Sequence, residues 1–132
     1  MVNVIGNTNG EWAAWHAALE EDTYESQDHP GQWIIFDFKR VRISPTAYLI
    51  RSKNLKSWTI EVSNDGLTWM EIDRQESIGE DDIYPSGATF QTDECCEYYR
   101  MFRLRQIGKN HSGNDILSID LFDVFGRVDP PI

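Results

Sequence analysis

The sequence predicts an all-β sandwich or barrel, because short strand-like segments follow one another with turn residues between them and no clear helices. Residues 57–63 alternate, with Trp58, Ile60 and Val62 on one face and polar side chains on the other. The turn sequence Asn64-Asp65-Gly66 follows directly and is typical of a β-hairpin.

The positions of the remaining strands follow from residue composition and from the turn residues between them. We expect strands at 32–38, 47–52, 57–63, 69–73, 88–91, 98–106 and 117–125. Ser44-Pro45-Thr46 should precede the second strand, and Gly126 should end the last one. Trp12, Trp15, His16 and Leu19 have near-helical spacing, so residues 11–21 could form a short helix. A long loop whose aromatic side chains pack against the domain is the alternative.

Length and charge limit the possible functions. A chain of 132 residues suits a single domain over 1–132, and the DPPI ending makes residues 128–132 the expected start of a linker. Its 22 acidic against 12 basic residues give a net charge of −10, which disfavours nucleic acid and anionic membranes as partners. The run Glu80-Asp81-Asp82 is interpreted as a solvated loop, and the isolated domain is expected to be monomeric.

Cysteine usage indicates the compartment. The two cysteines, Cys95 and Cys96, are adjacent and cannot form a disulfide framework. The beginning of the sequence also lacks a basic-then-apolar signal pattern. We therefore expect an intracellular, cytoplasmic location.

Three stretches carry a family resemblance. They are QWIIFDFK (residues 32–39), SWTIEVSNDGLTWMEID (57–73) and YRMFRLRQIGKNHSGNDILSIDLFDVFG (99–126). Their order and spacing resemble the discoidin domain (coagulation factor 5/8 type C, galactose-binding domain-like). The resemblance implies a jelly-roll β-sandwich with a binding role, and it leaves the ligand open because one fold serves many functions.

Two departures indicate a branch of the family. No cysteine lies near either end of the sequence, and the basic, aromatic loops of lipid-binding members are absent. The chain is thus most similar to the intracellular discoidin-like domains, including those of ubiquitin-ligase and scaffold assemblies.

Aromatic and basic residues have competing interpretations. Trp33, Trp58 and Trp69 could form a sugar-stacking platform, but their strand positions favour the core. Trp12 and Trp15 leave both readings open. Arg103 and Arg105 share a strand face and are expected to form ion pairs with Asp37 or Glu61 rather than to bind anions.

Catalytic and metal-binding motifs are missing from the sequence. The three histidines have no zinc-ligand spacing, and no nucleophile elbow, phosphate loop or dinucleotide fingerprint is present. We expect no enzyme activity, no cofactor and no metal site. The leading hypothesis is a module that docks a protein or peptide, with lectin-like glycan binding as the alternative and a hydrolase as a weaker one.

The expected binding surface follows from strand direction. If the first and last strands pair, as the resemblance implies, the loop 107–116 opens at the end opposite the termini, where the segment 10–32 also begins. A shallow polar surface there should combine Trp15, His16, Asp28, His29, Asn110, His111 and Asn114. Amide groups, imidazoles and an indole suit a polar ligand.

Overall fold

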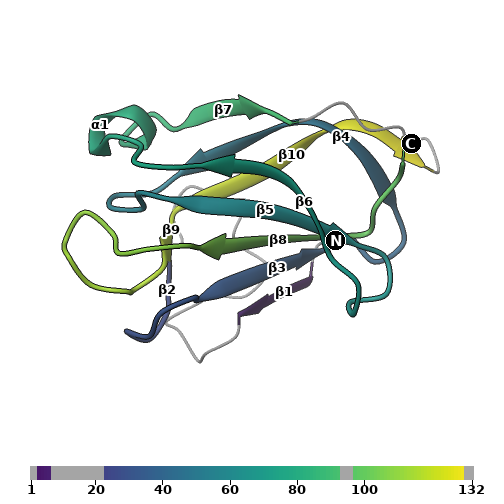
Figure 1. The fold of residues 1–132 in the computed structure, drawn as a ribbon. Coiled ribbons are helices and arrows are strands. Elements are labelled where there is room, and N and C mark those ends of the chain that lie inside the picture. The colour runs from purple at the N-terminus through teal and green to yellow at the C-terminus, as the bar shows by residue number, and fades with distance from the viewer. Residues whose placement is uncertain (1–2, 7–22, 93–96, 130–132) are drawn as a thin grey trace.

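Two antiparallel sheets face each other in the computed structural model, which describes residues 3–6, 23–92 and 97–129 (Figure 1). The five-stranded sheet has the order β1 (Asn3–Gly6), β3 (Trp33–Asp37), β8 (Met101–Gln106), β5 (Trp58–Ser63) and β6 (Met70–Gln75). The three-stranded sheet has the order β10 (Leu121–Asp129), β4 (Arg42–Arg51) and β7 (Ala88–Gln91). A small sheet pairs β2 (Tyr24–Glu25) with β9 (Ser118–Ile119), and α1 (Glu80–Ile83) is one short helix. The predicted jelly-roll β-sandwich is confirmed.

Alternating side chains fill the space between the two sheets. Phe36 of β3 stacks on Phe122 of β10 with ring centroids 4.5 Å apart. Trp58, which is fully buried, donates its indole N–H to the Tyr48 hydroxyl of β4 at 2.9 Å. Tyr48 in turn donates to Asp73 of β6 at 2.5 Å. Burial and the bond to Asp73 both raise the pKa of Tyr48, so the hydroxyl keeps its proton.

The strand β4 is longer than predicted. It begins at Arg42, so Pro45 lies inside a strand instead of before one. The register with β10 shifts between Phe125 and Gly126, and Gly126 lies opposite Pro45. A bulge of this kind accommodates proline, which cannot donate to the ladder. A side chain at Gly126 would collide with the Ser44 carbonyl, so this glycine permits close strand approach and does not end the strand.

Three other expected boundaries need correction. β10 continues to Asp129, and Val128 and Asp129 pair with Ile43 and Arg42, so the expected linker cannot start at residue 128. The predicted strand 117–125 is divided into β9 and β10. The run 80–82 forms a helical turn, although all three acidic side chains are exposed as expected. The possible helix at 11–21 lies outside the described residues.

The first and last strands do not pair, contrary to what the resemblance implied. β1 pairs with β3, whereas β10 pairs with β4 of the other sheet. Asn3 and Asp129 nevertheless lie at the same end of the sandwich, because β1 runs away from that end and β10 runs toward it (Figure 1). The loop after β8 therefore lies at the opposite end, as predicted.

Two of the three tryptophans expected in the core lie elsewhere. Trp58 is buried as predicted, but Trp33 and Trp69 are half-buried and do not belong to the core cluster. Both contact Arg103, whose guanidinium carbon lies 4.2 Å from the Trp69 ring centroid and 5.8 Å from that of Trp33. This contact is on the outer face of the five-stranded sheet, opposite the core side chains of β8. The prediction that these two tryptophans fill the core was wrong.

The predicted ion pairing of the β8 arginines is confirmed. Arg103 and Arg105 both contact the Glu61 carboxylate, at 2.5 and 3.5 Å. Asp37 pairs instead with Arg100, whose Nε and Nη2 donate to the two carboxylate oxygens at 2.7 and 2.9 Å. Burial alone would raise the pKa of Asp37, but the Arg100 side chain and the Lys39 backbone N–H lower it below its ordinary value.

The first prediction concerns the core. Replacing Trp58 by alanine removes the largest fully buried side chain and its hydrogen bond to Tyr48, so the free energy of unfolding should fall by roughly 3–5 kcal/mol. Urea denaturation followed by circular dichroism measures this loss. Leu67→Ala, at a side chain that is 86% exposed, is the control and should change stability by less than about 0.5 kcal/mol. Equal effects of the two substitutions would contradict the placement of Trp58.

The second prediction concerns the pH dependence of stability. Because the folded-state pKa of Asp37 is lowered, its pairing with Arg100 stabilises the fold above the ordinary carboxyl pKa and is lost as pH falls through the folded value. Arg100→Gln should lower the free energy of unfolding at neutral pH, and the loss should be modest because Arg100 is partly exposed. The difference in free energy of unfolding between this variant and the unchanged protein should disappear well below pH 3.8. A gap of the same size at every pH would refute the pairing as its cause.

Candidate functional site

Four connections of the described part of the chain meet at the end of the sandwich away from Asn3 and Asp129 (Figure 1). They are residues 26–32 before β3, 52–57 between β4 and β5, 76–87 around α1, and 107–117 after β8. The last of these is a polar loop without a helix, and it extends furthest from the sheets in the view of Figure 1. We call this the loop end.

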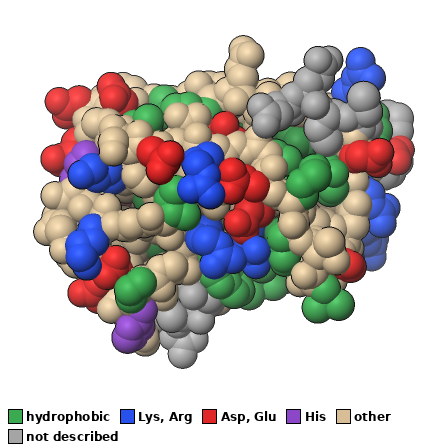
Figure 2. Space-filling view, in the orientation of Figure 1, with side chains coloured by type: hydrophobic (Ala, Val, Ile, Leu, Met, Phe, Trp, Pro, Cys, Tyr) green, Lys and Arg blue, Asp and Glu red, His purple; other side chains and the backbone are tan. Residues whose placement is uncertain are grey.

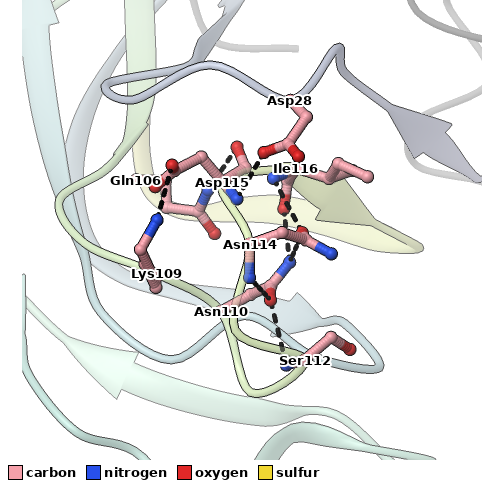
Figure 3. A network of polar contacts seen from close by, with 8 residues as sticks. All are labelled: Asp28, Gln106, Lys109, Asn110, Ser112, Asn114, Asp115 and Ile116. Atoms are coloured by element: carbon pink, nitrogen blue, oxygen red, sulfur yellow. Dashed lines mark hydrogen bonds and ion pairs between the residues drawn. The ribbon is translucent and has the colours of Figure 1, made fainter.

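Asn110 organises the loop 107–117 from inside (Figure 3). Its side chain is buried and donates to Asn114 Oδ1 at 2.7 Å and to the Ile116 carbonyl at 2.9 Å. Its own Oδ1 accepts from the backbone N–H groups of Ser112 and Asn114, at 2.9 and 3.2 Å. The amide therefore uses both donors and its acceptor within the loop, an Asx arrangement that replaces regular backbone pairing.

Asp28 joins the preceding connection to the same loop. Its Oδ1 accepts the backbone N–H of Asp115 at 2.8 Å, while Gln106 donates to the Asp115 carbonyl at 3.0 Å (Figure 3). Lys109 forms an ion pair with the Asp115 side chain at 3.0 Å. Asp115 is thus held by three residues, which fixes the loop at the end of the central strand β8.

His111 connects the loop to two further segments. Its backbone N–H donates to the Asn54 carbonyl at 2.9 Å. Its ring Nε2 lies 2.6 Å from the Ile78 carbonyl. A carbonyl only accepts, so Nε2 carries the proton in this contact. The histidine therefore holds together the connections 52–57, 76–87 and 107–117.

The residues expected at this surface have three different outcomes. Asp28, Asn110, His111 and Asn114 are brought together, but their polar groups mainly hold the loops in place. His29 is exposed in the same connection, and its backbone N–H donates to the Gln27 carbonyl at 3.2 Å. Trp15 and His16 lie outside the described residues, so their part in the surface stays a prediction.

The structure adds residues to this end that the sequence did not single out. Lys53 lies over the Tyr84 ring with its Nζ 5.9 Å from the centroid, and Lys53 itself is exposed. Asn54 Nδ2 lies 3.5 Å from the Ser112 hydroxyl. Within the described part of the chain, the buried side-chain oxygens of Asn54 and Gln106 accept no hydrogen bond. The only available signal was strand direction, which places the β4–β5 connection at the same end as the loop after β8.

The described residues include neither a metal-binding cluster nor a membrane-spanning helix. Residues 3–6, 23–92 and 97–129 contain no group of three or more His, Cys, Asp or Glu side chains arranged to hold a metal ion. Among these residues there is also no helix with the length and apolar character needed to span a membrane.

Comparison with known proteins places the fold. No family model matches the sequence. The domain superimposes on the CBM32 module CpGH89CBM32-5 of Clostridium perfringens, in complex with GalNAc-β-1,3-galactose, with a TM-score of 0.75 and 14% identity over 95% of both chains. It also matches the family 32 CBM of Clostridium perfringens NanJ, in complex with galactose, with a TM-score of 0.69 and 11% identity over 93% of this chain and 92% of that one. The chain has the discoidin-like fold of these modules.

One curated sequence is also similar. In an alignment 115 residues long that covers 78% of this chain, the sequence is 30% identical to the E3 ubiquitin-protein ligase Ufd4 of Drosophila melanogaster. The matched region spans 4% of the ligase. The domain therefore resembles one small part of a much larger protein.

The third prediction tests the internal order of the loop end. Asn110→Ala removes two donors and an acceptor, leaving the Ile116 carbonyl and two backbone N–H groups without their partner. We expect a loss of roughly 2–4 kcal/mol in the free energy of unfolding, measured by urea denaturation. Ser112→Ala, at an exposed hydroxyl of the same loop, should change it by less than about 0.5 kcal/mol. A negligible effect of Asn110→Ala would show that the loop is not held by this amide.

Proposed function

We propose that the domain is a non-catalytic module that binds a carbohydrate at the loop end. The observation that carries this proposal is the match to carbohydrate-binding modules over nearly the whole of both chains, two of them in complex with galactose-containing sugars. Because these identities are 14% and 11%, the ligand is inferred from fold and surface together.

The chemistry of the loop end supports a polar ligand that carries hydroxyl groups. Ser112 presents an exposed hydroxyl and Lys53 an exposed ammonium group beside the half-buried Tyr84 ring. Sugars offer hydroxyl groups to such donors and acceptors, and an apolar ring face to an aromatic side chain. The internal bonds of Asn110 and His111 fix the loop before any ligand arrives, which lowers the entropy cost of binding.

A second candidate function has its own support. The similarity to Drosophila Ufd4 favours a domain that docks a protein segment inside a ubiquitin ligase, with the intracellular location that this implies. In that case the same loop end would contact a peptide, and free sugars would not compete. The two candidates differ in ligand and share the expectation of a non-catalytic domain.

The fourth prediction tests glycan binding. Galactose and GalNAc-β-1,3-galactose, added to the ¹⁵N-labelled domain, should shift amide signals of residues 53–54, 84 and 111–114. Tyr84→Ala should weaken binding at least about fivefold, because the ring contributes a stacking face. The matched control is Phe125→Ala, at a 41% exposed aromatic side chain of β10, which should leave binding unchanged.

Three results would contradict this proposal. They are no shift with either sugar and no binding on a glycan array, shifts confined to the end that holds Asn3 and Asp129, or an equal loss in the control variant. Binding of peptides at the loop end without competition by sugars would support the second candidate instead.

A further inference from the structure

The outer face of the five-stranded sheet carries a cation held between two aromatic rings. Arg103 projects from the central strand β8, opposite the core side chains Phe102 and Leu104. Its guanidinium lies against Trp69 at 4.2 Å and faces Trp33 at 5.8 Å. The Trp69 indole donates to the Gly66 carbonyl at 3.3 Å, which fixes this ring over the arginine. These side chains form a rigid, half-buried group on a surface rather than in the core.

Acidic and basic side chains lie beside one another on this face, and two arginines share one carboxylate near its centre. Arg74 and Glu71 pair with each other at 2.9 Å, which leaves Glu61 as the carboxylate shared by Arg103 and Arg105. Arg103 has the shorter contact with it, and Arg105 remains at 3.5 Å. The side chain of Arg105 is 32% exposed, whereas those of Arg103 and Glu61 are each 14% exposed. Among the described residues, Glu61 therefore has two guanidinium groups beside it, Arg103 and Arg105, whereas Arg74 has the carboxylates of both Glu71 and Glu76 nearby.

Apolar side chains adjoin the arginines. Ile35 pairs with Arg103 across the β3–β8 ladder, and Ile5 pairs with Ile35 across the β1–β3 ladder. Ile5 is 45% exposed and Ile35 is half-buried. Figure 2 shows this side of the molecule, where basic and acidic side chains meet in the middle with hydrophobic side chains beside them. We call the surface of Trp33, Ile35, Trp69, Arg103 and Arg105 the sheet platform.

We propose that the sheet platform docks a protein segment that presents a carboxylate beside an apolar side chain. Tryptophan and arginine are the residue types that contribute most to protein–protein binding energy, above all where neighbouring groups exclude water. The guanidinium of Arg105 would pair with the carboxylate of the segment. The apolar side chain would lie on Trp33 and Ile35.

The arrangement also explains why an acidic segment fits and a basic one does not. A lysine or arginine placed here would add a cation to a centre that already holds two guanidinium groups for one carboxylate. Such like-charge contacts reduce affinity and slow association. The platform is separate from the loop end, so the domain could hold a sugar and a protein segment at once.

The test uses synthetic peptides and the intact domain. The probe is a labelled 12-residue peptide with two glutamates flanking one leucine in a Gly/Ser background, and the comparison peptide has lysines in place of the glutamates. We expect the acidic peptide to shift the indole N–H signals of Trp33 and Trp69 in ¹⁵N spectra, assigned through Trp→Phe variants. The lysine peptide should shift neither signal.

Charge variants locate the contact. Arg105→Gln should weaken binding of the acidic peptide at least about fivefold, and Arg105→Glu by more than that. Arg127→Glu, at an exposed position of the other sheet, makes the same charge change as Arg105→Glu and should weaken binding less than about twofold. Thermal melts confirm that each variant is folded, and Arg105→Gln provides the measurement if Arg105→Glu does not fold.

Several outcomes would overturn the proposal. They are unchanged indole signals at millimolar acidic peptide, equal shifts with the lysine peptide, or equal losses for Arg105→Gln and Arg127→Glu. Galactose shifts at the loop end would leave this result untouched, so failure here can be told apart from failure of the proposed carbohydrate binding.

Discussion

The two-residue alternation of β8 determines what lies on each side of the five-stranded sheet. Phe102, Leu104 and Gln106 point inward, and Arg103 and Arg105 point outward. The strand is paired on both sides, with β3 and β5, so its register cannot shift without moving apolar groups into water. The inward side builds the core, the outward side builds the sheet platform, and the inward Gln106 fixes the loop end through Asp115. Three features of the domain thus depend on one register.

Strand spacing and hairpin signals were sufficient to predict the fold class. The Asn64-Asp65-Gly66 turn joins β5 and β6 as expected, with Gly66 at positive φ. The Asp65 side chain accepts the backbone N–H groups of Leu67 and Thr68, and these bonds lower its pKa to about 2. Short-range chemistry of this kind is visible in the sequence because donor and acceptor are only a few residues apart.

Long-range packing could not be predicted in the same way. Trp33 and Trp58 both occur in aromatic strand segments, yet Trp58 is buried and Trp33 lies on the outer face. Period-two alternation distinguishes two faces of a strand without saying which one meets the other sheet. The expected pairing of Arg103 and Arg105 with Glu61 placed these arginines outside the core, and Trp33 pairs in register with Arg105. Arginines on one face of a central strand favour tryptophans beside them on that face, because guanidinium groups are attracted to aromatic rings.

The sequence predicted where the candidate residues lie better than it predicted what their side chains do there. Strand direction placed Asp28 and the loop 107–117 at the same end, and their contact through Asp115 shows that the two segments meet. The roles differ because short polar side chains in a loop must first satisfy the backbone groups that the loop leaves unpaired. Asn110 satisfies three of these groups, and a sequence pattern cannot separate such an amide from one that faces a ligand.

This internal use of polar groups bears on the binding that we propose for the domain. A loop held by Asn110, His111 and Asp28 does not need to reorganise when a ligand arrives, so little binding energy is lost to ordering. Among the described residues, the outer atoms of Ser112, Lys53, Tyr84 and His29 offer a small contact surface at this end. A small, rigid, polar surface suits weak and selective binding, which several copies or several surfaces can strengthen by raising effective concentration. A second docking surface on the sheet platform would raise the effective concentration within one domain. A partner held there would keep its own attached sugar or neighbouring segment close to the loop end.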